Sequence, residues 1–173
     1  SCVKALAERY GFTDYAAYTD YETALNEVDC DVVDICLPNF LHKDAALAAL
    51  AHGRHIISEK PLATTVEEAE EIMEAARRAD RHVYYAEDWL GCPTIQKALS
   101  IIESGAIGEL TFVRARECHC GSHSPFAQKL KFCGGGAMIH LGIHPVGFIL
   151  ALKGGSWTEL TALTSRGLEG NLI

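Results

Sequence analysis

Short apolar segments typical of strands alternate with helical segments over the first half of the chain. Strand patterns occupy residues 31–37, 55–58 and 83–86, and a shorter one covers 16–19. The segment 31–37 is β-branched and largely apolar, as expected for a strand that is buried on both faces. Because strands and helices follow each other in turn, the sequence predicts an α/β fold with a doubly wound parallel sheet.

Helix signals lie between these strand segments. A helix is expected to end near residue 10, a second to run over 21–28 behind the capping residue Asp20, and a third over 41–52. Residues 65–68 (Thr-Val-Glu-Glu) have the pattern of a capping box and predict a fourth helix. The apolar residues expected to share one face of that helix are Val66, Ala69, Ile72, Met73 and Ala76.

The pattern changes after about residue 90. A helix is expected over 94–104, a long strand over 109–117, a further helix over 137–152 and a final strand over 157–164. We therefore divide the chain into an α/β unit (1–90) and the beginning of an α+β sheet domain (91–173).

Charge and cysteine content exclude several classes of protein. The formal net charge is −8, and no basic patch of the kind that binds nucleic acid is present. No apolar run approaches the roughly 18 residues of a membrane span, so neither nucleic acid nor membrane is expected as a partner. The seven cysteines are an odd number, and Cys36 lies in an apolar strand segment. This pattern favours a reducing, cytoplasmic location over a disulfide framework.

The tripeptide Glu59-Lys60-Pro61 directly follows the strand segment 55–58. The carboxyl edge of a parallel sheet is where open α/β folds bind ligands. Proline removes a backbone donor and biases the preceding residue toward an extended conformation. The sequence therefore predicts that the Lys60 ammonium is held at a ligand-binding edge, the alternative being a surface lysine.

Four motifs in order resemble the Gfo/Idh/MocA family of nicotinamide-dependent sugar and cyclitol oxidoreductases. They are residues 37–42, 53–62, 104–110, and 134–136 together with His144. The resemblance implies a Rossmann-like domain that binds NAD or NADP, and a C-terminal α/β domain whose open sheet forms a homo-oligomer interface. Family members have roughly twice this length, as two ordinary domains do. The resemblance therefore also implies that the first strand, the Gly-rich phosphate loop and the last strands of the whole protein lie outside the chain.

The resemblance assigns the cofactor edge to two loops. It places Lys60 beside the nicotinamide and the reacting carbon of the substrate, with Glu59 next to the cofactor and a peptide bond before Pro61 that is often cis. It places the segment 37–42 under the nicotinamide and its ribose. The candidate cofactor contacts in this segment are Leu37, Pro38, Asn39 and His42. Two alternatives stay open: Glu59 is a solvated acid, and His42 only opens the following helix through a backbone bond.

The substrate side is expected to include two histidines that are four residues apart on one helix, His140 and His144. By resemblance, His144 contacts a substrate hydroxyl or acts as the acid/base partner of Lys60, and His140 stands where the family has an aspartate. A second aspartate of the family is replaced by Gly147. The alternative for His140 is packing in the core.

The loop around residues 118–123 contains further candidate residues. We expect His119 and His123 to make polar contacts with the substrate and Trp89 to stack on a sugar face, although core packing is an equal alternative for Trp89. A metal site built from the histidines and cysteines is possible in principle, but the C-x-C spacing of Cys118 and Cys120 is not a standard zinc motif. We therefore expect no functional metal.

The leading functional hypothesis is hydride transfer between a nicotinamide cofactor and a sugar, cyclitol or related polyhydroxy substrate. Lys60 and His144 would manage the hydroxyl proton, with His140 as the third candidate. Two alternatives remain open: an NAD-dependent glycoside hydrolase that oxidises its substrate transiently, and a non-catalytic regulator that senses the cofactor.

Overall fold

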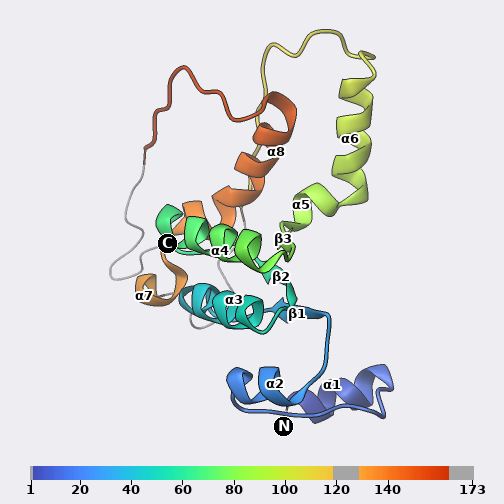
Figure 1. Ribbon diagram of the computed structural model, residues 1–173. Coiled ribbons are helices and arrows are strands. Elements are labelled where there is room, and N and C mark those ends of the chain that lie inside the picture. The colour runs from blue at the N-terminus through green and yellow to red at the C-terminus, as the bar shows by residue number, and fades with distance from the viewer. Residues whose placement is uncertain (1, 119–128, 164–173) are drawn as a thin grey trace.

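The computed structural model describes residues 2–118 and 129–163 (Figure 1). The first half of the chain contains α1 (Cys2–Tyr10), α2 (Tyr21–Glu27), β1 (Val32–Ile35), η1 (Asn39–Leu41), α3 (His42–Ala51), β2 (His55–Glu59), α4 (Val66–Ala79) and β3 (Val83–Ala86). The second half, from residue 88 on, contains α5 (Asp88–Gly91), α6 (Pro93–Glu103), α7 (Leu130–Cys133), the π-helix η3 (Met138–Gly142) and α8 (Ile143–Lys153). None of the described helices has the length and apolarity needed to cross a membrane.

The three described strands form one parallel sheet in the order β1-β2-β3. Val33 of β1 pairs with Ile56 of β2, which in turn pairs with Val83 of β3. Helices α3 and α4 connect consecutive strands and pack against each other (Figure 1). The predicted α/β fold with parallel strands is thus confirmed, and the carboxyl ends of all three strands meet at one edge.

The core lies between the sheet and α3 and α4. The fully buried side chains include Ile35, Ile56, Leu50 and Ile72. Alanines on α3, of which Ala46 and Ala49 are completely buried, allow the helix to approach the sheet closely. Burial of each large aliphatic side chain contributes about 1.5–3 kcal/mol, so this small cluster is the main support for the loops at the carboxyl edge.

The helix caps follow the sequence signals. Asp20 accepts a hydrogen bond from the Thr23 amide at 2.8 Å, and Thr65 accepts one from the Glu68 amide at 3.2 Å. Glu68 in turn accepts from the Thr64 hydroxyl at 2.6 Å, and this bond is the main reason why the pKa of Glu68 is lowered. The starts predicted for α2 and α4 are therefore confirmed.

One prediction about burial was wrong. β1 is only four residues long and is the edge strand of the described sheet, and its residues Val32 and Asp34 are exposed. On α4, Ile72 and Ala76 are buried as expected, but Val66 is 70% exposed and Met73 is 44% exposed. The helix contacts the sheet through a narrower stripe than its apolar pattern suggests.

Several expected elements differ in the described structure. The segments 16–19, 109–117 and 157–163 are not strands within it, because a strand needs a hydrogen-bonded neighbour and no described strand runs beside them. The expected helix 137–152 is divided into η3 and α8. The short helix α5, which packs against α8, was not anticipated.

Candidate active site

The loops that follow the three parallel strands lie at the carboxyl edge of the sheet, where α8 packs on α5. Lys60 directly follows β2, and Glu87 directly follows β3. Glu59 pairs with Ala86 in the parallel register, so the residues that follow them, Lys60 and Glu87, occupy equivalent positions at the ends of neighbouring strands. The edge therefore brings a cation and a carboxylate together beside the histidines of the second part of the chain.

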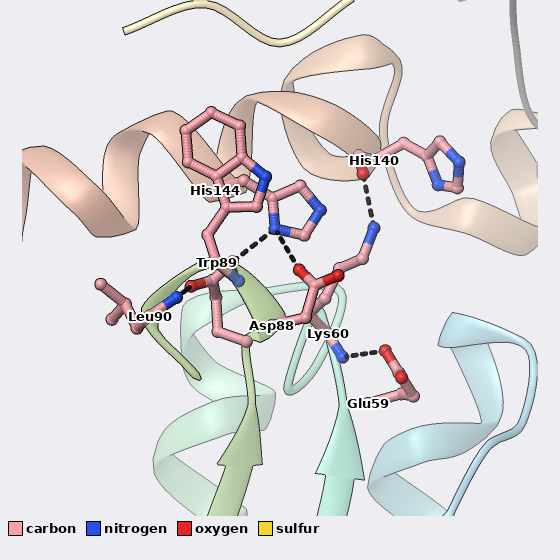
Figure 2. Close-up of polar contacts among 8 residues, drawn as sticks. Glu59, Lys60, Asp88, Trp89, Leu90, His140 and His144 are labelled. Carbon is pink, nitrogen blue, oxygen red and sulfur yellow. Dashed lines mark hydrogen bonds and ion pairs between the residues drawn. The ribbon is translucent and has the colours of Figure 1, made fainter. Parts of the chain in front are cut away.

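Lys60 is held in place by the backbone of η3. Its Nζ donates to the carbonyl oxygen of His140 at 2.6 Å, and its side chain is partly buried (Figure 2). The Lys60–Pro61 peptide bond is cis, as the family resemblance implied. Glu59 is exposed, and its Oε2 accepts from the Lys60 amide at 3.1 Å. The ammonium is thus fixed within the protein rather than directed into bulk solvent.

His42 joins the two cofactor-edge loops. Its side chain is fully buried, with Nδ1 at 2.7 Å from the carbonyl oxygen of Pro61 and Nε2 at 2.8 Å from that of Leu37. Both ring nitrogens face backbone carbonyls that belong to different loops. This geometry favours a role in holding the loops together over direct contact with a cofactor.

The loop after β1 is also tied to the second part of the chain. Asn39 is 7% exposed, and its Nδ2 donates to the carbonyl oxygen of Cys133 at 2.8 Å. The rings of Phe40 and Phe132 lie 5.3 Å apart between their centroids. Leu37 and Pro38 remain half-buried at the same edge. The loop that was expected under the nicotinamide is therefore anchored from both sides.

His144 is buried, and its surroundings are acidic. Its Nδ1 is hydrogen-bonded to Oε1 of Glu87 and lies 3.2 Å from Oδ1 of Asp88. The Trp89 ring stacks on the imidazole, with centroids 5.9 Å apart and an angle of 17° between the planes (Figure 2). The stacking partner of Trp89 in this structure is thus a protein side chain, which favours the packing alternative for this residue.

Sequence reasoning missed Glu87, although it is the residue that organises this side of the site. It caps α5 and accepts hydrogen bonds from the amides of Trp89 at 3.2 Å and Leu90 at 2.9 Å. An acid immediately after a parallel strand was the available signal, by the same argument that singled out Lys60. That signal was lost because no motif of the family resemblance covers residue 87.

The structure separates the other candidate residues. His140 offers its carbonyl oxygen to Lys60, while its ring extends away from His144 in the view of Figure 2. His119 and His123 lie outside the described residues, and Cys118 is exposed. Among the described residues, ligand atoms of Glu87, Asp88 and His144 lie within 4.8 Å of one another. A metal could use these atoms, but the Glu87 oxygens already accept hydrogen bonds.

The acidic character of the edge is reflected in the titration of Tyr85. Burial raises its pKa to about 12, and the negative charges of Glu87 and Glu59 add to this shift. The phenol therefore stays protonated throughout the neutral pH range. Two carboxylates thus act on the same part of β3.

Two family models match this chain. Residues 2–87 match the model described as "Oxidoreductase family, NAD-binding Rossmann fold", and residues 95–171 match the "GFO/IDH/MocA C-terminal domain".

Named relatives cover the same region. A levoglucosan dehydrogenase of Pseudarthrobacter phenanthrenivorans is 32% identical over 86% of this chain and 39% of its own length. A D-glucoside 3-dehydrogenase of Escherichia coli is 35% identical over 83% of this chain and 41% of its own length. A solved levoglucosan dehydrogenase in complex with NADH and levoglucosan is 30% identical, with a TM-score of 0.72 over 88% of this chain and 42% of that one. The chain thus spans about two-fifths of the length of these relatives.

Proposed function

The chain belongs to the Gfo/Idh/MocA oxidoreductase family, and from this premise we propose that the protein transfers hydride between a nicotinamide cofactor and a sugar, cyclitol or related polyhydroxy compound. The observation that carries the proposal is the position of Lys60. Its ammonium lies at the carboxyl edge of a parallel sheet, fixed by the His140 carbonyl and next to the element that holds His144.

The residues at this edge fit the nicotinamide end of a dinucleotide. The half-buried Leu37 and Pro38 offer an apolar surface to a ring, and the exposed Glu59 carboxylate can accept from ribose hydroxyls. The amide nitrogen of Asn39 and both ring nitrogens of His42 are engaged by backbone carbonyls. We therefore propose that four residues at the edge contact the cofactor, namely Leu37, Pro38, Glu59 and Lys60, while Asn39 and His42 shape the loops. When bound, the nicotinamide ring supplies the hydride acceptor or donor.

Lys60 and His144 have complementary roles in handling the substrate hydroxyl. The Lys60 ammonium donates to the oxygen on which negative charge develops, a form of stabilisation that is strong where water is excluded. Because Nδ1 of His144 is engaged by Glu87, Nε2 is the ring nitrogen that can exchange a proton with a hydroxyl. In Figure 2, this second nitrogen is directed to the side on which the Lys60 ammonium lies.

The test is the variant Lys60→Ala in the full-length protein. Hydride transfer to sugars should fall at least about 100-fold, because the donor to the developing oxyanion is removed. The affinity for NAD should change by less than about tenfold, or 1.4 kcal/mol. Lys153→Ala is the matched control, since Lys153 also donates to a backbone carbonyl, that of Leu110, but at an exposed position. Wild-type rates of hydride transfer in Lys60→Ala would refute the proposal.

We further infer that the protein is cytoplasmic and forms homo-oligomers through its C-terminal part. The six cysteines among the described residues are free thiols, as is common in a reducing compartment. Large apolar side chains are strongly exposed after residue 105, including Phe112 at 79% and Leu160 at 81%. Such surfaces are typical of protein interfaces. Light scattering of the full-length protein that gave a monomer mass at all concentrations would contradict the oligomer.

A further inference from the structure

We propose that Glu87 is the positioning residue of His144 and supplies the carboxylate that orients this base. The inference rests on the proposed function, in which His144 exchanges a proton with the substrate. The consecutive helices η3 and α8 carry His140 and Gly147, respectively, at the two positions where the family resemblance implies aspartates. The carboxylate found at the imidazole comes instead from the junction of β3 and α5.

The Glu87 carboxylate is itself rigidly held. Its side chain is 4% exposed, and that of His144 is 8% exposed, so the bond between them is shielded from water. The backbone amides of Trp89 and Leu90 donate to the two carboxylate oxygens and fix their orientation. Hydrogen bonds to an ionised acceptor are about twice as strong as neutral ones. Glu87 is therefore a pre-set acceptor rather than a mobile side chain that follows the ring.

A fixed acceptor at Nδ1 selects one form of the imidazole. The neutral ring then carries its proton on Nδ1, so that Nε2 presents a lone pair to a substrate hydroxyl. Trp89 stacks on the ring and restricts its rotation. Asp88 also lies near Nδ1, at 3.2 Å, but its side chain is 83% exposed, so its charge is screened by water. Glu87 is thus the carboxylate that governs the ring.

Gly147 makes room for this arrangement. A Cβ atom at residue 147 would lie 3.6 Å from Oε2 and 3.7 Å from Cδ of Glu87, in van der Waals contact. An aspartate there would bring a second negative charge against a buried carboxylate, which is unfavourable. Gly147 on α8 therefore leaves space for the side chain of Glu87, which follows β3. The carboxylate beside His144 comes from Glu87 instead of from α8.

The same atoms could hold a divalent metal, but the observed bonding favours the positioning role. A metal would take oxygens that now accept two amide protons and the imidazole proton, and this would uncap α5. A metal is accordingly an outcome of the test rather than part of the proposal.

The test compares Glu87→Gln with Asp20→Asn in the full-length protein. Both substitutions replace a capping acid by its amide, but Asp20 caps α2, away from the site. Nitrogen NMR of the histidine rings reports the proton position directly, with the His144 signals assigned by their loss in His144→Gln. The wild type and Asp20→Asn should show His144 protonated on Nδ1, whereas Glu87→Gln should show a mixture of the two tautomers.

Kinetics give the second measurement. In Glu87→Gln, kcat for sugar oxidation should fall about 10- to 100-fold, a part of the 10²–10⁴ that a positioned base contributes, while KM changes less than about threefold. Should this variant fail to fold, Glu87→Asp keeps the charge and a good capping group but withdraws the carboxylate by one methylene, and the same changes are expected.

Three results would overturn the proposal. The first is an unchanged His144 tautomer with unchanged kcat in a folded Glu87 variant, and the second is a loss of kcat no larger than that of Asp20→Asn. The third is wild-type activity that disappears on chelation and returns with added Zn²⁺ or Mn²⁺. The proposed function fails separately: hydride transfer that survives Lys60→Ala refutes it, while the tautomer of His144 still reports on Glu87.

Discussion

Replacement of His42 by alanine should destabilise the protein strongly, because this ring links two loops through buried contacts. The substitution removes a ring whose nitrogens lie 2.7 Å from the Pro61 carbonyl oxygen and 2.8 Å from that of Leu37, at a residue that is 0% exposed. Each buried polar group left unsatisfied costs about 1–3 kcal/mol. A neutral ring donates through one nitrogen only, so the expected loss in the free energy of unfolding is about 2–5 kcal/mol, with the void included.

Urea denaturation followed by circular dichroism measures this loss. With a slope of about 2 kcal/mol per molar urea, the midpoint should fall by about 1–2.5 M at unchanged slope. His52→Ala is the matched control, because His52 also contacts a backbone carbonyl (Ala48, at 2.8 Å) and a side-chain oxygen (Asn26, at 3.2 Å) but is exposed. Its substitution should cost less than about 1 kcal/mol.

The result that refutes the reasoning is a His42→Ala midpoint equal to that of His52→Ala, together with a large loss of NAD affinity. His42 would then be a cofactor ligand, as the sequence motif alone suggested. A large stability loss, with NAD affinity of the remaining folded protein reduced only modestly, supports the structural role.

Two further predictions concern the same edge. Gly134→Ala should lower the free energy of unfolding by about 2–4 kcal/mol, because φ is +74° and the new Cβ would lie 2.6 Å from Cγ2 of Thr64. The control is Gly108→Ala, where φ is +72° but no neighbour lies within 4 Å. Thermal unfolding of this control measures the backbone part of the loss alone. Tyr85, whose pKa is raised from 10.0 to about 12, keeps its proton in the folded state between those values while the unfolded chain loses it, so stability should fall as pH rises through this window. An absorbance titration of wild type minus Tyr85→Phe checks this, and a difference that titrates near 10 contradicts it.

The alternation of strands and helices could be predicted because each signal is local. The β-branched run before Pro38, the cap Asp20 and the capping residue Thr65 act within one turn or one strand, and the structure confirms β1, α2 and α4. Within the described residues, the segments 109–117 and 157–163 do not form the expected strands, for the opposite reason. An extended segment becomes a strand only when a neighbour supplies hydrogen bonds, and this neighbour is not specified by the segment itself.

The candidate site divides in the same way. The placement of Lys60 at the edge followed from its position after a strand, and the family resemblance rested on contiguous motifs. The partners of these residues did not follow: Lys60 is bound by the backbone of residue 140, 80 positions away in sequence, and His144 by Glu87, 57 positions away. No spacing rule connects residues so far apart, so the motif placed the side chains but not their orientation.

The amino-acid sequence by itself determined the kind of fold, the family and the edge at which a ligand is expected, because periodicity, capping and short motifs are properties of neighbouring residues. Only the tertiary structure decided which carboxylate faces His144, that His42 binds two loops instead of presenting a free ring, and that Trp89 stacks on a histidine. The surroundings of His144 and Trp89 depend on the packing of α5 against α8, and those of His42 depend on the approach of the loops after β1 and β2. In both places the free energy of a contact is set by burial and distance and not by separation along the chain.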